Sequence, residues 1–215
     1  HWSTDTNDGE RGALLQSVRE RYNRIQQQLL FVEVEWAEVP DERAEMLLDH
    51  EALADYRHYL ETEHLQKEHV LSEPEEKILS EKSITGKQAW TRYFDETLGA
   101  TRYDLDGEEL TQEEILSKLY EPDRALRRDA ALAFTEELKD NQRTLTFVFN
   151  TLLADKASTD RLRGYEHWLE SRNLSNEVDD ETVEALIEAV TGRYDLVARF
   201  YGLKQRLLGL DELYD

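Results

Sequence analysis

The apolar residues of this chain recur mostly at the helical spacing of three and four positions. The first run is the longest and comprises Leu14, Val18, Tyr22, Ile25, Leu29, Val32 and Trp36. Residues with this spacing lie on one face of an α-helix, so the pattern predicts a long helix that is stopped by Pro40. Shorter helices are predicted over about 41–48 and 52–65. Residues 1–10 are polar, and we interpret them as a loose tail.

Helix-start signals organise the middle of the chain. Ser72 with Glu75, and Thr111 with Glu114, have the spacing of a capping box, in which the two side chains satisfy backbone N–H groups of the first turn. Helices are therefore predicted from these points to about residues 83 and 120. Gly86 separates the first of them from a further helix that carries several aromatic residues.

The helical period breaks between these two capping boxes. Asp106-Gly107 favours a tight primed turn because both residues tolerate positive φ. The sequence predicts a short β-hairpin that pairs 102–105 with 108–110. Two strands alone are marginally stable, so this hairpin must pack against helices.

The last third of the chain returns to helical periodicity. Pro122 is predicted in the first turn of a helix, whose buried stripe would comprise Leu126, Ala130, Ala133 and Leu138. Further helices are predicted over 182–191 and 196–207, the latter ended by Gly209. The fold class is thus all-α: a predominantly helical lobe with one short β-hairpin near residues 102–110. No linker divides the chain, so residues 11–215 are predicted to form a single lobe.

Composition narrows the possible functions. The 215 residues carry a net charge of −22 and contain no cysteine. The negative charge argues against binding to nucleic acid or to anionic membranes. The absence of cysteine excludes disulfides, thiolate metal sites and a cysteine nucleophile, and it agrees with a cytoplasmic protein. No apolar run approaches the roughly 20 residues that a membrane span needs.

Several blocks of residues carry a family resemblance. They lie at 71–79, 82–90, 122–131, 149–156, 161–177 and 194–210, and the first reads Leu-Ser-Glu-Pro-Glu-Glu-Lys-Ile-Leu. Each block is short, but their order extends over about 145 residues. Together they resemble the oligoendopeptidase F branch of the M3 zinc metallopeptidases. The region before Leu71 fits the variable N-terminal part of that family less distinctly.

The resemblance implies an activity for a larger protein. Such proteins are zinc endopeptidases that cleave short peptides, and their helical N-terminal part forms one wall of the substrate channel. Their C-terminal part carries His-Glu-x-x-His, in which two histidines bind zinc and the glutamate activates a water. That motif is absent from this chain. We therefore expect a lobe that ends before the catalytic part, is inactive alone, has no catalytic or metal-binding residue, and has that part and short peptides as partners.

A few residues are candidates for contacting substrate. The resemblance places Tyr165, Arg172 and Asn176 in a polar block, and they are our candidates for the channel surface. Aromatic side chains at helical spacing could also line a channel, but the pattern favours a core role for them. They are Trp36, Trp90, Tyr93, Phe94 and Trp168.

Histidine and arginine clusters have simpler interpretations. His50, His58, His64 and His69 lie close in sequence and could bind a metal, but they do not share one helix face, which favours surface or hydrogen-bonded roles. The basic cluster of Arg124, Arg127 and Arg128 could contact a peptide carboxylate. Pairing with nearby Asp and Glu on a solvated face is the favoured interpretation.

Two alternatives to the peptidase lobe remain open. One is a free-standing acidic helical module that binds basic partners, and the other is a degenerate paralogue that kept the lobe and lost catalysis. A lobe separated from its catalytic part should expose an apolar surface, whereas a complete module should be polar throughout.

Overall fold

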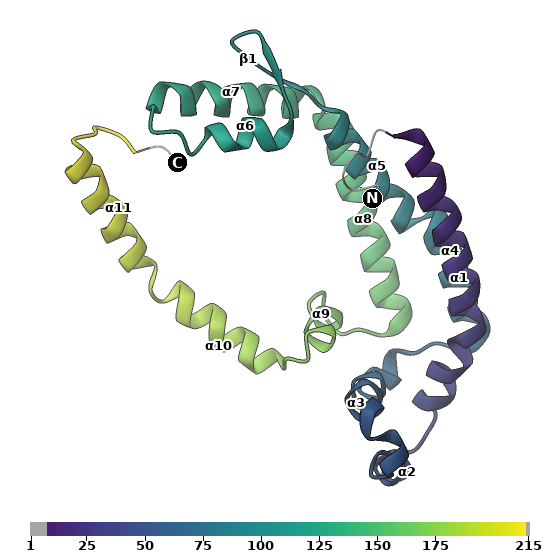
Figure 1. The fold of residues 1–215 in the computed structure, drawn as a ribbon. Coiled ribbons are helices and arrows are strands. Elements are labelled where there is room, and N and C mark those ends of the chain that lie inside the picture. Colours follow the sequence, from purple (N-terminus) through teal and green to yellow (C-terminus); the bar gives the residue numbers. More distant parts are fainter. Residues whose placement is uncertain (1–7, 214–215) are drawn as a thin grey trace. The chain divides into compact units, whose positions relative to one another are not determined.

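The computed structural model describes residues 8–213 and is almost entirely helical, which confirms the predicted fold class (Figure 1). Its α-helices are α1 (Gly9–Ala37), α2 (Asp41–Leu48), α3 (Arg57–Leu65), α4 (Glu73–Thr85), α5 (Lys87–Ala100), α6 (Gln112–Lys118), α7 (Arg124–Asp140), α8 (Gln142–Arg163), α9 (Glu170–Ser175), α10 (Asp180–Thr191) and α11 (Tyr194–Leu208). The chain divides into two compact units, 1–164 and 165–215. None of the described helices is long and apolar enough to cross a membrane.

Helix α1 confirms the predicted long helix but begins earlier than expected. The Asp8 side chain accepts hydrogen bonds from the backbone N–H groups of Glu10 and Arg11 and so caps the helix at Gly9. Residues 9 and 10, interpreted from sequence as part of a tail, are therefore helical. The rest of that tail, residues 1–7, lies outside the described residues.

The side-chain hydrogen bonds between α1 and α4 come from polar residues of α1. The buried Asn23 donates to the Ser80 carbonyl of α4 at 2.8 Å, and Gln27 donates to Glu81 at 2.8 Å. The apolar stripe from Leu14 to Val32 is instead largely exposed. Periodicity thus predicted the helix correctly, but its apolar face has no cover among the described residues.

Two 3₁₀ segments flank α3 and modify the helix predicted over 52–65. Residues Glu51–Tyr56 form η2 and Lys67–His69 form η3, so only 57–65 are α-helical. The Trp36 indole N–H donates to the Leu60 carbonyl at 2.8 Å and ties α3 to the end of α1. Its ring lies 5.5 Å from that of His64, centroid to centroid.

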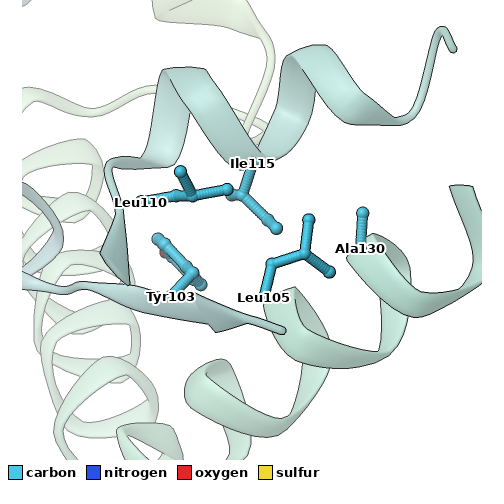
Figure 2. Close-up of a cluster of buried hydrophobic side chains, with 5 residues drawn as sticks. All are labelled: Tyr103, Leu105, Leu110, Ile115 and Ala130. Carbon is cyan, nitrogen blue, oxygen red and sulfur yellow. The ribbon is translucent and has the colours of Figure 1, made fainter. Parts of the chain in front are cut away.

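The predicted hairpin is present and closes the best-packed region of the chain. Strand β1 (Tyr103–Leu105) pairs antiparallel with β2 (Glu108–Leu110), and Asp106 and Gly107 both have positive φ as the turn requires. Figure 2 shows its apolar side chains against those of α6 and α7. The hairpin cluster comprises Tyr103, Leu105, Leu110, Ile115 and Ala130, all buried.

Helix starts around this cluster follow the sequence signals with one exception. Both predicted capping boxes are formed, by Ser72 with Glu75 and by Thr111 with Glu114. The prediction for Pro122 is wrong, because Asp123 caps α7 and the helix begins at Arg124. The Asp123 side chain accepts from the Ala125 N–H at 2.8 Å, so the carboxylate sets the start and the proline precedes it.

A buried ion pair joins two distant segments of the first unit. Arg163, at the end of α8, donates to both carboxylate oxygens of Glu76 in α4, at 2.6 and 2.8 Å. Arg163 also donates to the His69 carbonyl at 2.9 Å, and the Leu71 N–H donates to Glu76 at 3.0 Å. These bonds satisfy a carboxylate that is only 9% exposed.

The second unit contains α9, α10 and α11. Helix α9 was not predicted, because its six residues are too short for a periodic signal. Helices α10 and α11 lie where predicted, and Gly209 ends α11 in the left-handed conformation. Neither α10 nor α11 contains a buried residue.

Candidate functional site

An open groove of about 1000 Å³ lies in the first unit, between α5 and the junction of α7 with α8. A single residue, Asn141, separates α7 from α8, and residues from the end of one helix and the start of the next line one wall. Helix α5 forms the other wall and packs against α8. The lining residues are Trp90, Tyr93, Lys139, Asp140, Gln142, Arg143, Thr144, Thr146, Phe147 and Asn150.

Three aromatic rings form the apolar part of this groove. Trp90 meets Phe147 edge-on with 5.4 Å between centroids, and Tyr93 lies 6.4 Å from Trp90 in a similar geometry. Tyr93 and Phe147 remain 47% and 59% exposed. Such edge-to-face contacts fix ring orientation while leaving faces open to a ligand.

The core interpretation of the aromatic residues is therefore wrong for most of them. Tyr93 and Phe94 are exposed, and Trp168 in the second unit is 71% exposed. Only Trp36 and Trp90 are half-buried. The sequence pattern located the helix faces correctly but could not show that the chain leaves these faces open.

Two cationic side chains line the polar part of the groove, and only one of them is paired within the described chain. Lys139 pairs with Glu136 of its own helix at 2.6 Å. The Arg143 guanidinium has no ion pair or hydrogen bond to any other residue of the described chain. Arg143 lies in the first turn of α8, whose N-cap Asn141 makes no side-chain cap. Sequence reasoning missed Arg143 because an isolated arginine carries no motif.

The residues predicted for a channel surface all lie in the second unit. Tyr165 is half-buried just after Gly164, whereas Arg172 and Asn176 are exposed. The last two are one helical turn apart, and the Asn176 N–H donates to the Arg172 carbonyl at 2.9 Å. This brings their backbones together, and their role at a channel stays a prediction.

The histidines lie in separate environments. His64 contacts Asp41 through Nε2 at 2.8 Å, and His69 Nδ1 bonds to the Arg163 carbonyl at 3.0 Å. His50 Nδ1 accepts from the Ala52 N–H at 3.2 Å. Among residues 8–213, no group of three or more His, Asp or Glu side chains is arranged to hold a metal ion.

The arginine cluster is divided between two kinds of contact. Arg128 pairs with the adjacent Asp129 at 2.8 Å, as the sequence suggested. Arg127 instead donates to the backbone carbonyls of Glu121 and Pro122 at 2.7 and 3.0 Å. It thereby satisfies carbonyls that precede α7 and holds the turn between α6 and α7.

Two carboxyl groups, Glu33 of α1 and Glu63 of α3, have raised pKa values. Burial raises the pKa of Glu33, and the charges of Glu63 and Glu76 raise it further. Burial also raises the pKa of Glu63. The pKa of the Tyr59 hydroxyl is raised by burial and by the charges of both Glu63 and Glu33. Neighbouring charges thus add to the effect of burial at Glu33 and Tyr59, whereas burial alone acts on Glu63.

In the second unit, a hydrogen-bonded cluster joins α9 to the start of α10. Asn173 donates to one oxygen of Asp180 at 2.6 Å, and His167 contacts the other at 2.8 Å. The Asn173 amide, followed by His167, lowers the pKa of Asp180 because both stabilise its ionised form. The cluster fixes the turn between the two helices.

Comparison with known proteins identifies the family to which this chain is similar. The family model described as Oligopeptidase F matches residues 35–103. This chain is a relative of oligopeptidase F. It matches the N-terminal region of that family, which confirms the resemblance inferred from sequence.

Curated relatives extend the match along the chain. The group B oligopeptidase PepB of Streptococcus agalactiae is 30% identical over 173 residues, which are 78% of this chain and 29% of that protein. The oligopeptidase PepF of Bacillus subtilis is 25% identical over 181 residues, 81% of this chain and 27% of that protein. The chain thus spans less than a third of the length of these relatives.

A solved structure shows the same fold. The oligoendopeptidase-F of Enterococcus faecium superposes with a TM-score of 0.86 at 20% sequence identity. The superposition covers 99% of this chain and 43% of that one. The helical architecture is therefore that of one part of a larger oligoendopeptidase F structure.

Proposed function

We propose that this chain is the N-terminal lobe of an oligoendopeptidase F-like zinc metalloendopeptidase, and that it forms one wall of a channel for short peptides. The observation that carries the proposal is the uncovered apolar surface of a chain that matches only part of longer oligopeptidases. The lobe would restrict entry to short, unfolded peptides and help to exclude water from the reaction.

Helices α10 and α11 supply the strongest support. Neither helix contains a buried residue, yet each carries a row of large apolar side chains that are 45% exposed or more. The row comprises Leu186, Ile187, Val190, Leu196, Val197, Phe200, Leu203 and Leu207. Helical stability in proteins comes mainly from packing of the apolar face, so a further part of the protein is needed to cover these helices.

The same surface weighs against the free-standing acidic module. Such a module should be polar throughout, but the apolar stripe of α1 is also exposed, with Leu14 at 64% and Tyr22 at 61%. A degenerate paralogue would expose the same faces. The full-length protein is needed to separate that alternative from an active peptidase.

Zinc would be held by the catalytic part, outside these residues. The M3 relationship implies that metal, and zinc would activate the attacking water. In this proposal, the lobe contributes surface and shape, with Tyr165, Arg172 and Asn176 as its substrate-facing candidates. The cytoplasm is the compartment we propose.

The test is an activity measurement on the complete gene product. We expect it to cleave internally quenched short peptides, to lose activity with a chelator and to regain it with zinc. The lobe alone should be inactive. A complete protein without His-Glu-x-x-His, or with no chelator-sensitive cleavage, would leave only the degenerate paralogue or the interaction module.

A further inference from the structure

We propose that the groove between α5 and the start of α8 binds the carboxyl-terminal end of a short peptide whose last side chain is aromatic. The peptide nature of this ligand rests on the proposed function, but the groove itself is a feature of the described chain. The site would therefore select among peptides by their last residue and by their free carboxylate.

The aromatic rings account for the side-chain preference. Trp90, Tyr93 and Phe147 come from two helices and bound the same groove, which offers an incoming ring more than one apolar wall. Aromatic side chains bind favourably against such offset and edge-on neighbours. A volume near 1000 Å³ is at the upper end of the range for small-molecule pockets and can hold two or three peptide residues.

Arg143 accounts for the carboxylate. The chain as a whole carries a charge of −22, yet this guanidinium has no carboxylate partner among residues 8–213. Guanidinium and carboxylate groups pair through two parallel hydrogen bonds, which makes arginine well suited to a peptide C-terminus. Asp140, which also lines the groove, is anionic and cannot pair with a carboxylate, so Arg143 and Lys139 are the cations of the lining.

Other polar groups of the groove remain free to bind peptide amides. The indole N–H of Trp90 and the side-chain amides of Gln142 and Asn150 have no hydrogen-bond partner in the described chain. These donors and acceptors belong to the lining of the same groove as the rings and the guanidinium. Their chemistry matches a peptide backbone rather than a purely hydrocarbon ligand.

The competing hollow on α11 lacks such walls. Its lining also includes an aromatic ring and two arginines, namely Phe200, Arg199 and Arg206. All of its lining residues belong to the one helix, so no second element opposes them. The groove at α5 and α8 is larger, about 1000 Å³ against 640 Å³, and side chains of three helices line it.

The experiment is an NMR titration of the 215-residue chain with N-acetyl-Ala-Phe and with its C-terminal amide. The indole N–H signal of Trp90, assigned with Trp90→Phe, reports binding at the groove. We expect the free acid to shift this signal and to bind roughly tenfold more tightly than the amide, as for one charge-assisted contact. Arg143→Gln should bring the affinity for the acid down to that for the amide.

Two matched controls separate the site from general effects. Arg21→Gln makes the same charge change on exposed α1 and should leave both affinities unchanged. Phe147→Ala should weaken both ligands, whereas Phe149→Ala, two positions along α8 and similarly exposed, should weaken neither. Circular dichroism checks that each variant remains folded.

Three results would overturn the inference: no shift at Trp90, equal affinity for acid and amide, or equal effects of Arg21→Gln and Arg143→Gln. None of them bears on zinc-dependent cleavage by the complete protein. If the complete protein cleaves peptides and the groove binds neither probe, this inference fails alone. If the groove binds the acid and the complete protein does not cleave, the proposed function fails alone.

Discussion

The hairpin cluster and the α10–α11 helices both contain large apolar side chains, which are buried in the cluster and exposed on the helices. In the hairpin cluster, Ile115 and Tyr103 are fully buried by partners within about thirty residues of sequence. In α10 and α11, Ile187 and Phe200 remain 50% and 60% exposed. An amphipathic pattern therefore specifies a helix, whereas the packing of that helix depends on whether a partner surface is present.

The largest expected difference between the two regions is the loss of unfolding free energy when one isoleucine in each is replaced by alanine. Ile115→Ala removes three carbons from the closed cluster and should cost about 3 kcal/mol of unfolding free energy, through lost burial and a residual cavity. Ile187→Ala, on half-exposed α10, should cost less than about 1 kcal/mol. Urea denaturation followed by circular dichroism measures both. Equal losses would mean that α10 is packed in solution, contrary to its exposed face.

The buried ion pair supplies the next largest effect. Glu76→Gln leaves Arg163 without its carboxylate partner and should cost about 2 kcal/mol, below the range for fully buried pairs because both side chains keep some exposure. Glu73→Gln is the control, because Glu73 pairs with Lys77 on an exposed helix face and should cost less than about 0.5 kcal/mol. A loss for Glu76→Gln no larger than the control would show that the pair does not hold α4 to α8.

One substitution in the hairpin cluster should stabilise the protein. The Tyr103 hydroxyl is buried without a hydrogen-bond partner, and its ring stacks on Phe134 with 5.2 Å between centroids. Tyr103→Phe keeps the stacking and removes the unsatisfied group, so the free energy of unfolding should rise by about 1 kcal/mol. Tyr93→Phe, at an exposed ring, should change nothing measurable. Destabilisation by Tyr103→Phe would indicate a water that bonds to the hydroxyl.

The elements of this fold were predictable from sequence where the signals are local. Capping boxes at Ser72 and Thr111, the Asp106-Gly107 turn and the Gly209 stop each act within a few residues, and each was predicted correctly. Pro122 failed because the neighbouring Asp123 is the stronger cap for α7. Helix α9 was missed because it is too short to show a period.

The candidate groove was only partly predictable. The sequence offers Trp90 and Tyr93 as candidates for a channel lining, but their helical spacing favours a core role. Whether an aromatic face is covered depends on residues distant in sequence, as Phe147 is from Trp90. Local periodicity does not reveal such contacts between helices.

The smallest predicted effect concerns the polar contact of α1 with α3, which contrasts with the apolar hairpin cluster. The pKa values of Glu33 and Glu63 are raised above 4.5 in the fold, so the folded state holds protons that the unfolded chain releases. Stability from this pair is present at low pH and is lost as the pH rises through the raised pKa values. Glu63→Gln should therefore raise the melting temperature at pH 7, and the gain over wild type should shrink as the pH falls towards 4.5. Glu35→Gln is the control, because it also removes one negative charge, in this case from α1. A gain for Glu63→Gln that does not vary with pH would assign its effect to packing, and the acidic contact between α1 and α3 would then have no part in stability.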